Sequence, residues 1–272
     1  MTSSIISVLK NKPIVLIDES YYIFNRYYAT CSWFKRKNNE LDHDNIIENK
    51  EFIISFFRHF DADMKKITKK FKTVKENIIF CVDCCRADIW RNVYYDQYKA
   101  TRAKKNNFNS EIFAIFKNYI HQNQYQYCEC DNLEADDIAY LLQKKCREEI
   151  EKSFIIIITN DSDYLQLYDP SVFIINMQFK DLSLKINHTP KIELQLKIIF
   201  GDKSDNIQKI QYGLNKEKAI NLAKMVNEDL IKYLEKHNIL DKYILNKKLV
   251  DLSEIPENLK ILFYNKYLIN SI

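Results

Sequence analysis

Three short, continuous apolar runs constrain this chain more than any other feature of its sequence. They read Pro13-Ile-Val-Leu-Ile-Asp18, Asn77-Ile-Ile-Phe-Cys-Val-Asp83 and Phe154-Ile-Ile-Ile-Ile-Thr-Asn-Asp161. Runs of this length, rich in β-branched residues, are typical of strands buried on both faces of a parallel sheet. A weaker strand is predicted at Gln124–Glu129, and a final strand with a small hairpin at Val172–Asn176 and Leu182–Ile186.

Segments of helical character lie between these runs, at roughly residues 44–72, 109–121 and 133–150. The alternation predicts an α/β fold with a central, mostly parallel sheet flanked by helices. Thr189 followed by Pro190 is a helix start, so a helix is predicted at 190–200, and the chain reads as helical from there to its end. We therefore expect a sheet-containing domain at 1–189 and an all-helical C-terminal region at 190–272.

Composition sets broad limits on the class of protein. At 272 residues and 46% hydrophobic content, the chain can bury a sizeable core. It has no signal-peptide pattern and no apolar run near the roughly 20 residues that span a bilayer, so we expect a cytoplasmic monomer without membrane contact. Its 41 basic and 37 acidic side chains leave a net charge of +4, too small to establish nucleic-acid binding. The seven cysteines are irregularly spaced, and Cys81 and Cys84 are predicted to be buried free thiols rather than zinc ligands.

Acidic residues gather at the expected ends of the strands. Asp18, Asp83 and Asp161 each end one of the apolar runs. Because the carboxyl ends of parallel strands meet at one edge of a sheet, these side chains should converge there. Other acids are expected at the same edge: Glu134, Asp136, Asp137, Asp163, Asp202 and Asp205. Such a cluster is unfavourable without cations, and oxygen ligands without His or Cys suit Mg²⁺ or Mn²⁺.

A simpler interpretation applies to each acid taken singly. An acid at a helix start is as often a cap or a partner of the helix dipole as a ligand. Five separate acidic elements, three of them ending buried strands, are harder to explain in this way. On an ideal helix Glu134 and Asp137 share a face, but at a helix start the choice between Asp136 and Asp137 stays open. Two metal ions about 4 Å apart can hydrolyse a phosphodiester, and the protein then needs to supply little more than carboxylate ligands. The five histidines are scattered along the chain, so the sequence suggests no competing Ser/His/Asp triad.

A basic, aromatic arm (residues 84–105) follows Asp83 directly. Its cations are Arg86, Arg91, Lys99, Arg102, Lys104 and Lys105, interleaved with Trp90, Tyr94, Tyr95 and Tyr98. Cations for phosphates and aromatic faces for bases are what a path for single-stranded nucleic acid needs. The alternative is a solvated amphipathic segment with its aromatics in the core. The position of the arm beside the acidic edge favours the nucleic-acid path.

Together these segments resemble the 5′-nuclease (flap endonuclease) superfamily of PIN-like folds. The matching stretches are Val15–Asp18, Asp83 with Trp90-Arg91, Tyr98-Lys99 and Arg102, Leu133–Asp137, Thr159–Leu167 and Gly201–Ile207. Their order and separations agree over residues 13–220. Within the superfamily, the Trp90-Arg91 spacing and the late segment Leu252–Tyr267 resemble the T-even phage RNase H type of 5′→3′ exonuclease.

The resemblance implies a role for each acid. Asp18, Asp83, Glu134 and Asp136 would hold one metal, and Asp161, Asp163 and Asp205, with Asp202 nearby, would serve a second. Asp137 would lie behind these ligands and support them.

The resemblance also implies roles for the arm. Lys99 and Arg91 would contact the scissile phosphate at the base of an arch, at about 84–107, that admits a 5′ single strand. The other nucleic-acid contacts would come from Arg86, Tyr98, Arg102, Lys104 and Lys105.

One segment departs from the family pattern. Members usually carry a glycine-rich hairpin between two helices, which grips the duplex and often binds K⁺. Here the stretch Gln208–Lys218 has Gly213 alone, which counts against a K⁺ site, and Lys209, Lys216 and Lys218 could contact phosphates instead. The only glycines in the chain, Gly201 and Gly213, bracket this helix–hairpin–helix-type element, so special backbone geometry is expected there.

The resemblance therefore predicts a 5′→3′ exonuclease and 5′-flap endonuclease that uses two Mg²⁺ ions, for which Mn²⁺ can substitute. It would remove RNA primers or flaps during replication, acting on branched or nicked duplex DNA and on RNA–DNA hybrids with a 5′ single strand. A sliding clamp or a single-strand-binding protein is a candidate partner, and a phage or other virus is the expected source. The competing hypotheses are a PIN-like endoribonuclease that acts on RNA alone and a catalytically silent nucleic-acid binding factor.

Overall fold

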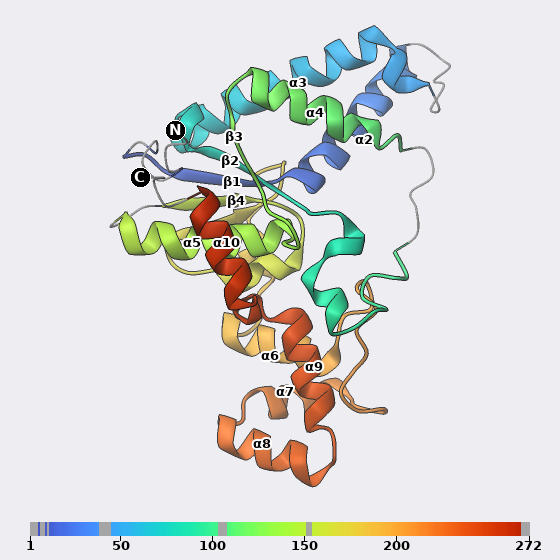
Figure 1. Ribbon diagram of the computed structural model, residues 1–272, viewed down its shortest axis with the longest axis vertical. Helices are drawn as coiled ribbons and strands as arrows, with labels where there is room; N and C mark the ends of the chain where they lie inside the picture. The colour runs from blue at the N-terminus through green and yellow to red at the C-terminus, as the bar shows by residue number, and fades with distance from the viewer. Residues whose placement is uncertain are drawn as a thin grey trace.

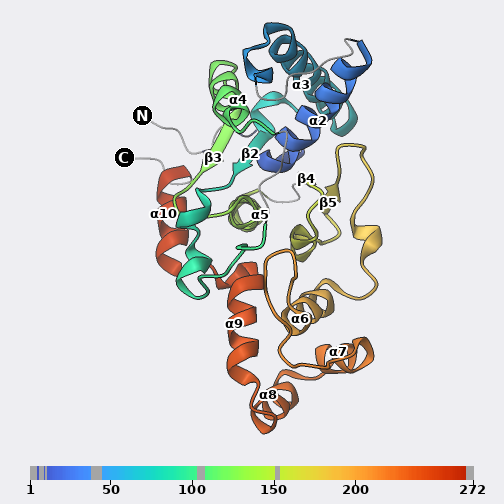
Figure 2. The same cartoon turned by 90° about the vertical axis from the view of Figure 1, so that its right-hand side faces the viewer.

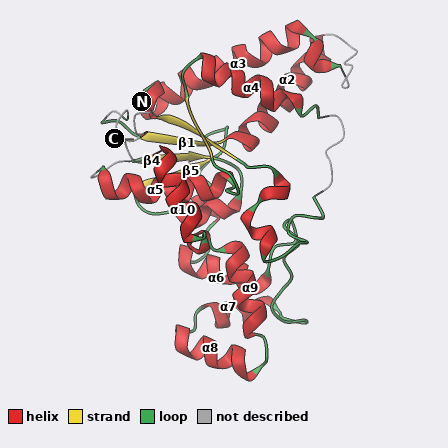
Figure 3. Ribbon diagram, in the orientation of Figure 1, coloured by secondary structure: helices red, strands yellow, loops and turns green. Residues whose placement is uncertain are grey.

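The apolar runs form the centre of a five-stranded parallel sheet (Figures 1 and 3). The computed structural model describes residues 5, 9, 11–37, 45–102, 108–150 and 154–267. The strands are β1 (Ile14–Asp18), β2 (Ile78–Val82), β3 (Gln126–Glu129), β4 (Ile155–Ile158) and β5 (Val172–Ile175), in the spatial order β3-β2-β1-β4-β5. β1 lies between β2 and β4, so the three strands that carry an aspartate at their ends are neighbours. The predicted α/β fold is confirmed.

Helices cover both faces of the sheet, because alternate strand residues point to opposite sides (Figure 2). Val15 and Ile17 pack with helices α2 (Glu19–Lys37), α3 (Lys50–Phe71) and α4 (Glu111–Gln122). Leu16 and Ile79 pack on the other side, against helix α5 (Ala135–Glu149). All strand residues of β1, β2 and β4 are buried, which explains why these runs are continuously apolar.

Two local features differ from the sequence-based expectation. Helix α2 was not predicted, because its aromatic and β-branched residues resemble a strand more than a helix, although Tyr22, Tyr27 and Cys31 recur at helical spacing. The hairpin at 182–186 was also wrongly predicted. A single antiparallel bridge joins Ile175 to Asp181, and the Asp181 carboxylate then accepts hydrogen bonds from Ser183, which turns the chain into a short 3₁₀ helix.

The C-terminal residues are helical, as expected, but they divide between two cores. Helices α6 (Pro190–Phe200), α7 (Lys216–Ala223), α8 (Asn227–Lys236) and α9 (Leu240–Val250) pack around a core of their own, which also takes in Ile89 and Tyr98 of the arm. Helix α10 (Glu257–Tyr267) returns to the sheet, where Phe263 is fully buried and the Tyr267 hydroxyl donates to the Glu129 carbonyl at 2.6 Å. The last helix thus belongs structurally with the sheet.

The cysteines form no disulfide, and the described helices include no candidate membrane span. All seven cysteines are free thiols, and Cys81 is buried as predicted while Cys84 is half-buried. Among the described helices, none combines the length and the apolar character that crossing a bilayer requires.

The loop between α6 and α7 depends on its two glycines, both of which have positive φ. Gly201, with φ of 70°, ends α6 and lies so close to the next turn that a Cβ there would meet the Ile207 carbonyl oxygen at 2.3 Å. Asp202 and Ile207 then pair in an antiparallel bridge. Gly213, with φ of 71°, has open space around it. The first glycine is required by close packing and by backbone conformation, the second by conformation alone.

This difference predicts unequal effects of two matched substitutions. Gly213→Ala is expected to lower the free energy of unfolding by about 1–2 kcal/mol, the cost of a left-handed alanine. Gly201→Ala adds a backbone clash, so the loss should exceed that of Gly213→Ala by about 1–3 kcal/mol. Urea denaturation of both variants beside the parent measures the difference. Equal losses would show that the loop relaxes around a Cβ at residue 201.

Candidate active site

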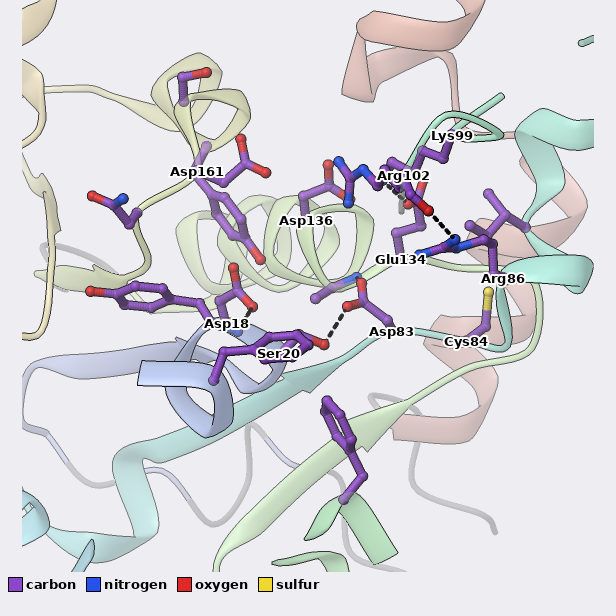
Figure 4. A pocket seen from close by; sticks show the side chains of 18 residues that line it. Asp18, Ser20, Asp83, Cys84, Arg86, Lys99, Arg102, Glu134, Asp136 and Asp161 are labelled. Atoms are coloured by element: carbon purple, nitrogen blue, oxygen red, sulfur yellow. Dashed lines mark hydrogen bonds and ion pairs between the residues drawn. The ribbon is translucent and has the colours of Figure 1, made fainter. Parts of the chain in front are cut away.

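Five of the predicted acids line one cavity of about 690 Å³ at the carboxyl edge of the sheet: Asp18, Asp83, Glu134, Asp136 and Asp161. Figure 4 shows them around the cavity, with Arg86, Lys99 and Arg102 on the side opposite Asp18 and Asp161. The convergence follows from the sheet order, since Asp18 and Asp83 leave neighbouring strands and Asp161 follows β4. The sequence-based prediction of an acidic cluster at this edge is confirmed.

Both central aspartates are held by hydrogen bonds to each of their oxygens. The Asp18 carboxylate accepts from the Tyr21 backbone N–H at 2.9 Å and from the Thr159 hydroxyl at 2.8 Å. The Asp83 carboxylate accepts from the Ser20 hydroxyl at 2.7 Å and from the Ala135 backbone N–H at 2.9 Å. These contacts fix the orientation of the two carboxylates, because each oxygen has one protein donor.

The start of α5 separates the acids of Leu133–Asp137 into two environments. Glu134 and Asp137 form a reciprocal capping box, which turns Asp137 inward until it is fully buried. Asp136 points the other way and lines the cavity. The structure therefore places Asp136 at the cavity and Asp137 behind it.

The charges of the cavity acids oppose one another. Burial, followed by the nearby Asp83, raises the pKa of Asp18 to about 7. Burial, Asp137 and Glu134 raise the pKa of Asp136 well above its usual value. Hard oxygen donors that repel one another in this way are stabilised by a divalent cation, so the donor set fits Mg²⁺ or Mn²⁺.

A second acidic group adjoins the first. One carboxylate oxygen from each of Asp163, Asp202 and Asp205 lies within 4.8 Å of the other two. Lys197 of α6 forms ion pairs with Asp163 and, at 2.8 Å, with Asp202. Burial opposes ionisation of Asp202, but Lys197 and Ser204 lower its pKa to about 2. A second acidic group is thus present, but Asp161, which was predicted to belong to it, lines the cavity of the first set.

Lys99 connects the two acidic groups. Its ammonium pairs with Glu134 and lies 3.8 Å from Asp205, and its backbone N–H donates to the Asp205 carbonyl at 3.0 Å. The residue has φ of 56°, a left-handed conformation that is unfavourable for lysine and typical of functional sites. Arg102 pairs with Asp205 at 2.5 Å and, with Lys99, forms part of the cavity wall.

Arg91 does not reach the cavity, contrary to the expected contact with a phosphate. Its side chain is buried, and its guanidinium forms two 2.8 Å bonds to Asp137 and one to Glu134, while Nε donates to the Leu249 carbonyl. Over its described residues 84–102 the arm consists of turns and short 3₁₀ helices rather than a regular helix, so spacing along it does not reveal which cation faces the cavity.

Some aromatic residues of the arm are buried in the core, as the alternative interpretation of the arm predicted, and others are exposed. Tyr98 is buried, and its hydroxyl lies 3.1 Å from Glu134 and 3.3 Å from Asp205, so its ring offers no face to a base. Trp90 is buried and donates to Asp137 at 2.9 Å, whereas Tyr94 is exposed. Lys104 and Lys105 lie outside the described residues.

The predicted contacts of the hairpin region lie on the α6–α7 loop and in the first turn of α7, and none of them lines the cavity. Lys209, Lys216 and Lys218 are exposed, and so is Gly213. Lys209 is partly engaged within the protein, since its ammonium donates to the Leu214 carbonyl at 3.2 Å. Any role of these residues would concern a part of the substrate away from the acids.

Sequence reasoning missed three residues at or near the acids. Glu19 is buried beside Asp83, its pKa is raised to about 8 by burial, and it accepts a 2.6 Å bond from Tyr127. Burial and the charges of Asp18 and Asp136 raise the pKa of the Tyr164 hydroxyl. The third missed residue is Lys197, which pairs with Asp163 and Asp202. Glu19 follows Asp18 directly and Tyr164 follows Asp163, so position along the chain was the available signal.

Comparison with known proteins agrees with this geometry. A 5′-3′ exonuclease from Buchnera aphidicola (Schizaphis graminum strain) is 25% identical over 205 residues, which is 73% of this chain and 65% of that protein. DNA polymerase I of Streptococcus pneumoniae is 24% identical over 264 residues, 92% of this chain but 27% of the polymerase. The chain thus spans just under two thirds of the length of the Buchnera exonuclease and about a quarter of the polymerase.

Two solved structures from bacteriophage T5 have the same fold. Its flap endonuclease, in a pseudo-enzyme–product complex with DNA and metal ions, aligns with a TM-score of 0.65 at 16% identity, over 94% of this chain and 98% of that one. The T5 5′-exonuclease with bound zinc aligns over the same shares with a TM-score of 0.62 at 16% identity. The model of the 5′-3′ exonuclease N-terminal, resolvase-like domain matches residues 13–195. The chain therefore belongs to the family of 5′-3′ exonuclease N-terminal, resolvase-like domains.

Proposed function

We propose that this chain is a metal-dependent 5′→3′ exonuclease and structure-specific 5′-flap endonuclease. The observation that carries the proposal is the cavity in which five carboxylates face Arg86, Lys99 and Arg102. Acids can hold divalent cations there, and basic side chains beside them can hold a phosphate. Phosphodiester hydrolysis needs both in one place.

In this proposal the acids hold two ions, as the family resemblance implied. Asp18, Asp83, Glu134 and Asp136 would hold one, and Asp161, Asp163 and Asp205, with Asp202, the other. When bound, the ions supply an activated water and stabilise the leaving oxygen. The protein contributes carboxylates oriented in advance, since the hydrogen bonds to Asp18 and Asp83 fix their geometry. Mg²⁺ is the proposed ion and Mn²⁺ a substitute.

Lys99 is the proposed phosphate contact. Its ammonium pairs with Glu134, a proposed ligand, and a cation bound to Glu134 would compete for that carboxylate. The ammonium would then be available to a phosphate oxygen, on which negative charge increases in the transition state. We assign the accompanying contact to Arg102 rather than to the buried Arg91, whose guanidinium orients Glu134 and Asp137.

The substrate is proposed to be duplex DNA or RNA–DNA hybrid with a 5′ single strand, whose cleavage would remove primers or flaps in replication. The single strand would pass the arm at about 84–107, and residues 190–272 would contact the duplex through Lys209, Lys216 and Lys218. The T5 flap endonuclease was crystallised with DNA, which supports this class of substrate. A sliding clamp or a single-strand-binding protein remains a proposed partner.

Two other functions predict different behaviour. A PIN-like endoribonuclease would cleave RNA alone, but the arm and the α6–α9 core are additions that such an enzyme does not need. A catalytically silent binding factor would have no use for mutually repelling acids that raise the pKa of Asp18 and Asp136. Both observations favour the nuclease.

A cleavage assay tests the proposal. The full chain is incubated with a 5′-flap DNA, an RNA-primed duplex and a single-stranded RNA, each with Mg²⁺ or with EDTA. We expect Mg²⁺-dependent release of short 5′ products from the first two substrates. Cleavage that persists in EDTA would exclude the metal mechanism, cleavage of the single-stranded RNA alone would favour the endoribonuclease, and binding without cleavage would favour the silent factor.

Lys99→Met should separate catalysis from binding. We expect kcat on the flap substrate to fall by about 10²–10³-fold, because one charge-stabilising donor is lost in the transition state. The dissociation constant of the duplex should change little, since Lys99 lies within the cavity wall. Lys69→Met, in the exposed last turn of α3, is the matched control and should change neither value. Equal losses in kcat and in affinity would assign Lys99 to binding only.

A further inference from the structure

Tyr164 has a buried hydroxyl to which no described residue offers a hydrogen bond. The residue lies in the 3₁₀ helix Ser162–Leu167 directly after Asp163, is 2% exposed, and lines the cavity with Asp18, Asp83 and Asp136. Within the described part of the chain, its Oη has no hydrogen-bond partner. A buried hydroxyl without a partner is unfavourable by about 1–3 kcal/mol, so such a group calls for an explanation.

Two other buried tyrosines, Tyr98 and Tyr22, show the usual arrangement. The Tyr98 hydroxyl bonds to Glu134 and Asp205, and the Tyr22 hydroxyl to Asp63 at 3.1 Å. The Tyr164 ring packs in the core beneath the sheet, so it cannot swing into solvent. Its hydroxyl is therefore held where the described residues provide no acceptor, and the neighbouring charges that act on it most strongly are those of Asp18 and Asp136.

The carboxylates near this hydroxyl are already oriented by other groups. Both oxygens of Asp18 accept from Tyr21 and Thr159, and both oxygens of Asp83 accept from Ser20 and Ala135. Tyr164 is thus not needed to orient these two carboxylates. A phenol is a hydrogen-bond donor at neutral pH, and Tyr164 lines the same cavity as these acids.

We propose that Tyr164 positions the hydration of the divalent cation held by Asp18, Asp83 and Asp136, with its hydroxyl donating a hydrogen bond to a water in that hydration. Mg²⁺ gives up its waters reluctantly and keeps several of them in protein sites, so such a water is expected there. Tyr164 follows Asp163 directly, so the same short 3₁₀ helix carries the proposed donor and a member of the second acidic group. The inference rests on the proposed function, since it requires that the acids bind a cation.

Tyr164→Phe tests the role, because it removes the hydroxyl and keeps the ring in the core. Tyr233→Phe is the matched control, since the Tyr233 hydroxyl is also buried without a hydrogen-bond partner among the described residues but belongs to the separate α6–α9 core. Mg²⁺ is titrated into the full-length parent and both variants by calorimetry, and Tm is measured in EDTA. We expect Tyr164→Phe to weaken Mg²⁺ binding by about 10–100-fold, the usual effect of losing a group that supports a metal from behind its ligands. Tyr233→Phe should leave the affinity unchanged.

The metal-free Tm separates this role from a structural one. Tyr164→Phe should not lower Tm in EDTA, because the hydroxyl has no partner in the protein to lose. A lower Tm, or an unchanged Mg²⁺ affinity in a parent that binds Mg²⁺ and cleaves DNA, would overturn the inference and leave the proposed function standing. A parent that binds no Mg²⁺ would overturn both.

Discussion

Asp136→Asn is expected to lower kcat for phosphodiester cleavage by roughly a thousandfold at saturating Mg²⁺. The substitution keeps the shape of the side chain and an acceptor for the Asp137 backbone N–H, which lies 2.8 Å from Asp136. It removes one negative charge from the cavity, where a divalent cation contributes several kcal/mol of transition-state stabilisation and each 1.36 kcal/mol is tenfold in rate. Single-turnover cleavage of a 5′-flap substrate measures the change.

The stability of the same variant distinguishes a ligand from a structural acid. The pKa of Asp136 is raised in the folded protein, so at neutral pH its charge destabilises the metal-free fold relative to the unfolded chain. Asp136→Asn should therefore leave the metal-free protein as stable as the parent or more so. Asp137→Asn is the matched control, and there we expect lost stability because Arg91 loses its charged partner. Near-normal kcat in Asp136→Asn would remove Asp136 from the proposed ligands.

Arg91→Met is expected to lower the free energy of unfolding by about 3–5 kcal/mol, the usual effect of removing one partner from a buried ion pair. Arg91 is 1% exposed and its guanidinium neutralises Asp137 and Glu134 together, so both acids would lose a buried cation. It also donates to the Leu249 carbonyl at 3.0 Å and so joins α9 to the start of α5. Urea denaturation monitored by circular dichroism measures the loss.

Two further variants check this interpretation of Arg91. Combining Arg91→Met with Asp137→Asn should recover part of the stability, because the uncompensated charge disappears with its partner. Lys145→Met, which breaks only the exposed pairs with Glu148 and Glu149, should change stability by less than about 1 kcal/mol. If Arg91→Met keeps the stability of the parent but loses cleavage, the original prediction that Arg91 contacts a phosphate is correct.

The strands and the acidic edge were predictable because they depend on short-range patterns. Continuous runs such as Ile14–Asp18 become strands buried on both faces, and their ends must share one edge. Helix α2 was less predictable, since seven of its residues are aromatic and intrinsic propensity does not favour a helix there. Its packing against α3 and the sheet supplies the stability that its composition lacks.

The details of the site depended on contacts between distant segments. The choice between Asp136 and Asp137 followed from the capping box and from Arg91, which lies 46 residues before Asp137. The choice between Arg91 and Arg102 followed from the turns of the arm, because Asp205 attracts Arg102 to the cavity wall. Lys197 joined the second acidic group because α6 packs beside the 3₁₀ helix that carries Asp163.

The order of residues along the chain predicted that carboxylates would gather at one edge of a parallel sheet, with basic residues following Asp83. It did so because strand direction, strand burial and the position of a residue at the end of a run are all local properties. The three-dimensional fold was needed to learn that Asp136, Lys99 and Tyr164 line the cavity, whereas Asp137 and Arg91 are buried behind it. Side-chain direction at helix starts and in irregular turns is set by partners from elsewhere in the chain, and these partners meet only when the fold is complete.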